Sequence, residues 1–194
     1  MSKKLTKVAI AYDFDGTLAP GNMQQHSFIP HLGIDSNTFW GEVKSLAKEN
    51  DMNEILAYMQ HMLKRAGEKR VPVTKKAFVE YGKDMPLFPG VKAFFSKIND
   101  YAKSKGLKIE HYIISSGLRD ILKGTSIYRE FEMVFASGYK FSENDVASGQ
   151  PWQLIIPIKH SSCLGSTKAL LIHGITKAST NICLTAKDIC LSTG

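Results

Sequence analysis

One stretch near the N-terminus constrains the fold of this chain more than any other: Val8 to Leu18, V-A-I-A-Y-D-F-D-G-T-L. A continuous apolar run rich in Val and Ile indicates a strand buried on both faces of a parallel sheet. The run stops at two carboxylates, Asp13 and Asp15, and Gly16 then turns the chain away. Parallel sheets bind ligands at the carboxyl ends of their strands. The sequence therefore predicts an α/β fold with a site at the end of this strand.

The two carboxylates are suited to a divalent cation. Side chains alternate along a strand, so Asp13 and Asp15 point the same way while Phe14 points into apolar packing. Two like charges at that spacing are unfavourable unless a cation lies between them or one carboxyl is protonated. Carboxylate oxygens are also ligands that Mg²⁺ prefers. A lone D-x-D is equally typical of a turn that closes a strand, whereas the full D-F-D-G-T-L is far more specific.

This longer pattern resembles the first motif of the haloacid dehalogenase (HAD) superfamily, most of whose members are Mg²⁺-dependent phosphatases. The resemblance implies that Asp13 is the nucleophile that accepts a phosphoryl group as an aspartyl phosphate. It implies that Asp15 protonates the leaving oxygen and then activates the hydrolytic water. It also implies a Mg²⁺ site formed by the Asp13 carboxylate and the backbone carbonyl of Asp15.

A second motif follows a second apolar strand, expected at Lys108 to Ile114. That strand stops at Ser115, Ser116 and Gly117, and Leu118 opens a helix. A hydroxyl beside a helix N-terminus can bind a phosphate, although an N-cap serine explains the same letters. Together with D-F-D-G-T-L, the pattern resembles the second HAD motif. The resemblance implies that Ser115 binds the substrate phosphate, assisted by Ser116 and Gly117.

The segment between the two motifs is predicted to be helical. Apolar residues recur at helical spacing in three expected helices, Asn37–Asn50, Glu54–Glu68 with Asn53 as its cap, and Thr74–Gly82. These are either core helices or, as the resemblance implies, a cap that closes over the site and selects the substrate. The resemblance then divides the chain into a core domain, 1–18 and 86–149, and a cap, 19–85. Pro86–Val91 marks the return to the core, followed by a helix at Val91–Lys105 and a strand at Phe131–Ala136.

The C-terminal residues, 150–194, differ from the rest in composition. They contain four lysines, one acidic residue, Asp188, and all three cysteines, Cys163, Cys183 and Cys190. The third HAD motif, a lysine, and the fourth, an acidic pair, are not recognisable there. We expect this tail not to pack on the sheet, and the C-terminal part of the fold to be missing. Lys159, Lys168 and Asp188 remain the residues that could replace the absent motifs.

A lost base near the Gly149 codon explains this change. One base earlier, the DNA behind Gln150–Ser162 can encode P-A-x-A-I-N-Y-T-N-K-T-Q-F, which regains aromatic residues and a lysine where the third motif is expected. The tail is then an aberrant frameshift product. Because a positioned electrostatic stabiliser is worth about 100- to 1000-fold in rate, we expect a marginally stable chain with weak or no activity.

Composition narrows the function further. The net charge is +7, but the lysines are scattered among acids, so an anionic small substrate is favoured over nucleic acid. No apolar run approaches the roughly 20 residues of a membrane span, and we expect a cytoplasmic protein. An odd cysteine number argues against a disulfide framework. His111 is expected to be structural, and Glu143 and Asp145 to lie in an exposed turn rather than to bind metal.

The sequence thus predicts an α/β, Rossmann-like, mostly parallel sheet with a helical cap inserted after the first strand. By resemblance the chain is a phosphoserine-phosphatase-like HAD hydrolase that uses Mg²⁺ and acts on a small phosphorylated substrate. The alternative is a non-catalytic protein that keeps the fold and a phosphate-binding pocket.

Overall fold

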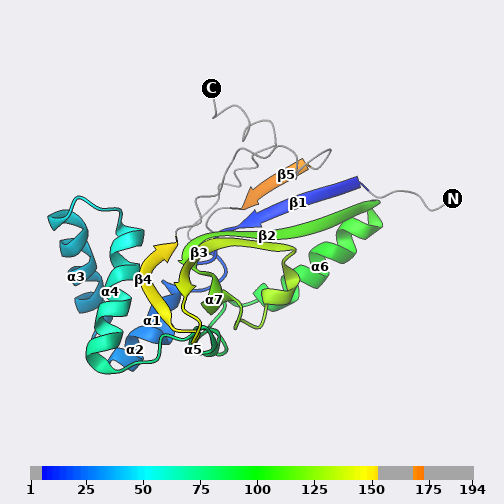
Figure 1. The fold of residues 1–194 in the computed structure, drawn as a ribbon. Coiled ribbons are helices and arrows are strands. Elements are labelled where there is room, and N and C mark those ends of the chain that lie inside the picture. The colour runs from blue at the N-terminus through cyan, green and yellow to red at the C-terminus, as the bar shows by residue number, and fades with distance from the viewer. Residues whose placement is uncertain (1–5, 153–167, 173–194) are drawn as a thin grey trace.

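The computed structural model describes residues 6–152 and 168–172 (Figure 1). Its sheet has five strands in the order β4-β3-β2-β1-β5. All neighbouring strands are parallel except β3 and β4, which are antiparallel. The strands are β1 (Thr6–Tyr12), β2 (Leu107–Leu118), β3 (Met133–Phe141), β4 (Ala147–Trp152) and β5 (Lys168–Ile172). The predicted α/β architecture with a mostly parallel sheet is confirmed.

The helices between β1 and β2 in the chain gather at the end of the sheet where these strands finish, except for the last of them, which runs along β2 (Figure 1). The helices are α1 (Met23–His26), α2 (Phe28–Leu32), α3 (Ser36–Glu49), α4 (Glu54–Lys69), α5 (Lys75–Tyr81), α6 (Val91–Ser104), α7 (Arg119–Leu122) and the 3-10 turn η1 (Tyr128–Glu130). The long helices lie within two residues of their predicted bounds. Asn53 caps α4 as predicted, because its side chain accepts a hydrogen bond from the Ile55 N–H at 2.8 Å.

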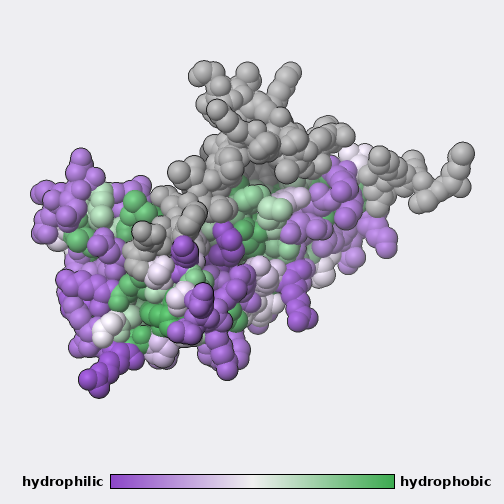
Figure 2. Space-filling view, viewed as in Figure 1, coloured by the Kyte–Doolittle hydropathy of each residue, from purple (hydrophilic) through white to green (hydrophobic). Residues whose placement is uncertain are grey.

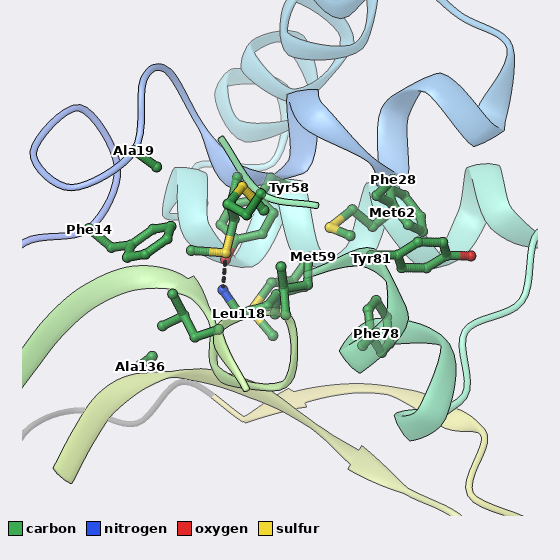
Figure 3. Close-up of a cluster of buried hydrophobic side chains, with 14 of the residues drawn as sticks. Phe14, Ala19, Phe28, Tyr58, Met59, Met62, Phe78, Tyr81, Leu118 and Ala136 are labelled. Carbon is green, nitrogen blue, oxygen red and sulfur yellow. Dashed lines mark hydrogen bonds between the residues drawn. The ribbon is translucent and has the colours of Figure 1, made fainter. Parts of the chain in front are cut away.

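One continuous core links the sheet to these helices. Beneath β1, the buried Tyr12 ring packs edge-to-face against Phe95 and Phe131. Beyond the end of the sheet, the cluster continues through Phe14 and Leu118 to residues of α4 and α5 (Figure 3). The helical segment therefore shares its core with the carboxyl end of the sheet, which fixes the two relative to each other.

His111 has the structural role that the sequence predicts. Its imidazole is buried in β2, where Nδ1 lies 2.8 Å from the Tyr12 hydroxyl and Nε2 lies 3.1 Å from Asn99 Oδ1. Asn99 Oδ1 can only accept, so Nε2 carries the proton and Nδ1 accepts from Tyr12. Burial lowers the pKa of His111 to about 4. The neutral ring thus joins β1, β2 and α6.

The structure differs from the sequence predictions in the lengths of two strands. β2 continues through the predicted serine turn to Leu118, with an irregular register between Ser115 and Leu118. The helix expected at Leu118 is only the single turn α7, because Leu118 pairs with Ser137 of β3 instead. β3 likewise extends to Phe141, well past the predicted Ala136, since the β4 hairpin strand pairs with its second half.

The expectation that nothing after Gly149 packs on the sheet is wrong for two segments. β4 reaches Trp152, and Lys168–Ile172 pairs in parallel with β1. The run A-L-L-I is apolar, and its backbone satisfies the N–H and C=O groups on the edge of β1 that β2 leaves open.

Two glycines bring the helical segment against the residues that follow β2. A Cβ built on Gly82, at the end of α5, would lie 1.9 Å from the backbone oxygen of Ile121 in α7. A Cβ on Gly124 would lie 1.9 Å from the oxygen of Val79. The two backbones touch because neither position carries a side chain, which explains both glycines.

The face seen in Figure 2 carries many hydrophilic side chains, including those over α3, with hydrophobic areas between them. Among the helices of residues 6–152 and 168–172, none combines the length and apolar character that a membrane crossing needs.

Candidate active site

The chain turns sharply after β1, and this turn presents the two predicted carboxylates. Gly16 adopts a positive φ of 74° and donates its N–H to the Ala19 oxygen at 2.8 Å, a conformation that favours glycine. The Leu18 N–H donates to the Phe14 oxygen at 2.9 Å. The Phe14 side chain is completely buried. The residues D-F-D-G-T-L therefore form a closed loop anchored by Phe14, as their alternation predicts.

Asp13 and Asp15 flank the buried phenylalanine and are both partly exposed. Asp13 Oδ1 accepts a hydrogen bond from the Phe14 N–H at 2.7 Å. Asp15 Oδ1 accepts from the Met23 N–H at 2.9 Å. Burial raises the pKa of Asp15 to about 7, an effect that the Met23 hydrogen bond opposes and the nearby Asp13 charge reinforces. A carboxyl with a pKa near neutrality can both donate and accept a proton in turn.

The second motif lies where β2 ends. Ser115 Oγ accepts a hydrogen bond from the Gly117 N–H at 3.0 Å, and the Leu118 N–H donates to the sulfur of Met23 at 3.2 Å (Figure 3). A Cβ on Gly117 would lie 2.1 Å from Met23 Cε, so the end of the Met23 side chain would have to move to admit any other residue. Ser115 and Gly117 are thus held in one compact turn. The Gly117 amide, expected to assist phosphate binding, is already used inside the turn.

Met23 connects the two motifs. Its N–H binds Asp15, its sulfur binds the Leu118 N–H, and its side chain is completely buried. The β1 turn and the β2 turn therefore pack on the same residue of α1. The structure brings Asp13, Asp15, Ser115, Ser116 and Gly117 to the same edge of the sheet, as the parallel pairing of β1 with β2 requires.

Two tyrosine hydroxyls fix α4 over this edge. Tyr58 donates to the Ser116 oxygen at 2.6 Å, and Tyr139 of β3 donates to the Met59 oxygen at 2.6 Å. The sequence identifies neither tyrosine as a contact residue, because Tyr58 lies in an ordinary amphipathic helix and Tyr139 lies beyond the strand predicted at Phe131–Ala136. Only their long-range partners reveal that they join helix and sheet.

A pocket of about 320 Å³ opens between the sheet edge and the helices. Asp15, Ser116 and Gly117 form one wall. This volume lies within the range of small-molecule sites. The pocket therefore contains residues of both predicted motifs.

The opposite wall comes from the helical segment. Gln24 belongs to α1, Trp40 and Lys44 to α3, and Glu54 and Tyr58 to α4. The Trp40 and Tyr58 rings pack with centroids 5.9 Å apart. No sequence signal distinguished these residues from core or surface positions.

Other candidate residues lie elsewhere. Asp145 is in an exposed turn with φ 57°, where its N–H donates to the Ser142 oxygen, as predicted. Lys168 pairs with Val8 in the β1–β5 register. That position is five residues before Asp13, roughly 16 Å along the strand at about 3.3 Å per residue. Lys159 and Asp188 lie outside the described residues.

Residues 6–152 and 168–172 contain no group of three or more His, Cys, Asp or Glu side chains that could hold a metal ion. Mg²⁺ commonly uses one or two carboxylates, completed by water and substrate phosphate oxygens. Asp13 and Asp15 fit that requirement. Their mutual repulsion, which contributes to the raised pKa of Asp15, would be relieved by a cation.

A larger pocket of about 470 Å³ lies between α3 and α4 and includes none of the predicted site residues. It is lined by an ion-pair cluster in which Glu42 contacts His61 at 2.7 Å and also binds Arg65. Arg65 holds the pKa of Glu42 below its usual range. These charges pair with one another, which is sufficient to explain the cluster.

No family model matches the chain. A protein from Borreliella burgdorferi, described only as uncharacterized, is 31% identical over 172 residues, which cover 76% of this chain and 60% of that protein. A HAD family hydrolase from Salmonella enterica has a similar structure, with a TM-score of 0.53, 19% identity, and coverage of 79% of this chain and 46% of its own.

Two further structures point to the same fold. A phosphoserine phosphohydrolase-like protein from Francisella tularensis has a TM-score of 0.50 and 23% identity, covering 75% of this chain and 64% of its own. A probable phosphoserine phosphatase from Vibrio cholerae has a TM-score of 0.52 and 10% identity, covering 91% and 52%. The chain thus spans only about half to two thirds of the length of these proteins. Its described residues have a HAD-like, phosphoserine-phosphatase-like fold.

Proposed function

We propose that this chain is built as a HAD-type phosphomonoester hydrolase that uses Mg²⁺ and acts on a small phosphorylated substrate. The observation that carries the proposal is the pocket lined by both Asp15, with its pKa of about 7, and the Ser116–Gly117 turn. A phosphoserine phosphohydrolase-like protein and a probable phosphoserine phosphatase share the fold.

The proposed residues divide the reaction between them. An Asp13 oxygen attacks phosphorus, the bond from phosphorus to the substrate oxygen breaks, and Asp15 donates its proton to that leaving oxygen. Water then attacks the aspartyl phosphate, Asp15 takes the water proton, and the phosphate leaves with Asp13 restored. Ser115 orients the phosphoryl oxygens. Mg²⁺ would be held by Asp13 and Asp15 and would neutralise charge on the transferring group.

Substitutions at three aspartates test this assignment. Asp13→Asn and Asp15→Asn should each lower Mg²⁺-dependent hydrolysis of an aryl phosphate by at least about 100-fold, because each removes a group that acts in the transition state. Asp145→Asn is the matched control, since asparagine tolerates its positive φ. Unchanged hydrolysis in Asp13→Asn would exclude Asp13 as the nucleophile.

A phosphate-binding protein without turnover is the second candidate. It is favoured by the register that places Lys168 at the start of β5, opposite Val8 and away from the end of β1 that carries Asp13. Such a protein would bind phosphate with Mg²⁺ and yet hydrolyse no ester. In that case Asp13→Asn would change Mg²⁺-linked affinity alone.

We also propose that residues 150–194 are read in a shifted frame. The Borreliella protein matches 76% of this chain, which is close to the fraction of the chain that lies before Gly149. The nucleotide sequence after the Phe131 codon tests this directly. An alternative frame that stays open into an acidic Gly-Asp motif supports the proposal, whereas an early stop in that frame contradicts it.

A further inference from the structure

Met23 lies behind the pocket rather than in its wall. Its side chain is completely buried. The residues on either side of it, Asn22 and Gln24, line the pocket that contains Asp15, whereas Met23 does not. Met23 therefore acts on a ligand in the pocket only through the groups that it contacts.

Those groups belong to both motifs. The Met23 N–H donates to Asp15 Oδ1 at 2.9 Å, and the Met23 sulfur accepts from the Leu118 N–H at 3.2 Å (Figure 3). The sulfur also lies 2.8 Å from the position that a Cβ on Gly117 would occupy, so the thioether fills the space that this glycine leaves. One residue thus contacts the proposed proton donor through its backbone and the turn of the second motif through its side chain.

The sheet alone does not fix these two turns relative to each other. β1 pairs with β2 over Thr6–Tyr12 and Leu107–Ile113, so Asp15 and the Ser115–Leu118 turn lie beyond the paired residues. The pairing of β2 with β3 is irregular between Ser115 and Leu118. Turns with separate anchors can shift relative to each other, and a misplacement of about 1 Å costs about 100-fold in rate. A shared anchor removes that freedom.

The sulfur distinguishes Met23 from an ordinary core residue. A thioether accepts a hydrogen bond, although weakly, whereas leucine fills a similar volume and accepts none. Met59 and Met62 of α4 are also completely buried. Met62 belongs to neither turn, so it offers the same Met-to-Leu exchange at a position with no direct link to the site.

We propose that Met23 is a positioning residue, which sets the Asp15 carboxylate and the Ser115–Leu118 turn at the separation that proton transfer to the leaving oxygen requires. This inference rests on the proposed function, because it takes Asp15 as the proton donor and the turn as the phosphate end of the pocket. Loss of the sulfur should therefore change phosphate binding and proton donation while the fold persists.

Phosphate binding tests the contact with the turn. We would measure the affinity of inorganic phosphate by calorimetry with Mg²⁺ for the full chain, Met23→Leu and Met62→Leu. Both exchanges conserve volume, which cores tolerate, and denaturant titration checks that both variants are folded. Met23→Leu should bind phosphate at least about tenfold more weakly, as expected if about a tenth of the molecules keep a competent turn. Met62→Leu should change the affinity by less than about twofold.

The leaving group tests the contact with Asp15. 4-Nitrophenyl phosphate releases a stable phenolate that needs little protonation, whereas propyl phosphate releases an alkoxide that needs the Asp15 proton. At saturating substrate, Met23→Leu should lower hydrolysis of propyl phosphate at least about tenfold more than that of 4-nitrophenyl phosphate. Met62→Leu should leave the ratio of the two rates unchanged. A purely structural role for Met23 would lower both rates by the same factor.

The outcomes separate the inference from the function on which it rests. Weaker phosphate binding together with a lower ratio of rates in Met23→Leu alone supports the inference. Equal phosphate affinities in the two variants, or an unchanged ratio in Met23→Leu, overturns it while the proposed function stands. If the wild-type chain hydrolyses neither ester, the proposed function fails and the inference fails with it.

Discussion

The two walls of the pocket differ in how completely their polar atoms are paired. On the sheet side, the Asp15 carboxylate accepts a backbone hydrogen bond from Met23, and the neighbouring Asp13 and Ser115, which do not line the pocket, accept from Phe14 and Gly117. On the helical side, Gln24 Oε1 and Trp40 Nε1 are unpaired within the part of the chain that the structure describes. The sheet wall is therefore organised without a ligand, as preorganised chemistry requires.

The helical segment touches the residues that follow β2 at Gly82, and substitution there is expected to give the largest change in the free energy of unfolding. Gly82→Ala places a Cβ 1.9 Å from the Ile121 backbone oxygen, which cannot move without displacing α7. We expect a loss of about 3 kcal/mol in the free energy of unfolding, at the upper end of overpacking effects. Denaturant titration measures it.

Gly67→Ala is the control, because Gly67 lies in α4 and a Cβ added there would meet no atom within 4 Å. There the better helix propensity of alanine should stabilise the protein by about 0.5–1 kcal/mol. Equal responses at Gly67 and Gly82 would contradict the close backbone contact between α5 and α7.

Acid should lower the free energy of unfolding, because the buried His111 of β2 is neutral in the folded protein. The folded-state pKa of His111 is lowered to about 4, so the unfolded chain binds the proton first, near pH 6.5. The stability contributed by the neutral ring is present above about pH 6.5 and is lost as the pH falls to about 4. The expected loss is at most about 3 kcal/mol.

Unfolding free energies measured between pH 7 and 4 test this, with His111→Gln as the comparison. The variant should lose the part of the acid dependence that belongs to His111. The same slope in the wild type and the variant would show that another group is responsible.

The hydrogen bond from the Tyr58 hydroxyl is expected to give the smallest of these changes in stability. Tyr58→Phe removes its hydrogen bond to the Ser116 oxygen and keeps the ring. Because Ser116 is exposed and water can replace the hydroxyl, the expected cost is about 1 kcal/mol. Tyr101→Phe, at an exposed tyrosine of α6, should change the unfolding free energy by less than about 0.5 kcal/mol. Equal values for the two variants would contradict a role for Tyr58 in joining the walls.

The same contrast explains what the sequence could predict. D-F-D-G-T-L and I-I-S-S-G are local patterns in which strand, turn and chemistry are adjacent, so Asp13, Asp15 and Ser115 were identifiable. Gln24, Trp40 and Tyr58 come from three helices, and their meaning depends on contacts such as that between Tyr58 and Ser116. Local periodicity contains no information about such partners. The extension of β2 to Leu118 was missed for the same reason, because pairing with Ser137 determines it.

The central claim is that Asp13 accepts a phosphoryl group. The most direct measurement is mass spectrometry of the full chain, quenched with acid after incubation with Mg²⁺ and an aryl phosphate. If Asp13 is the nucleophile, the peptide that contains it gains the mass of one phosphoryl group, and the Asp13→Asn chain shows no such mass. An unmodified Asp13 peptide in a chain that binds phosphate, or a phosphoryl group on another residue, would contradict it.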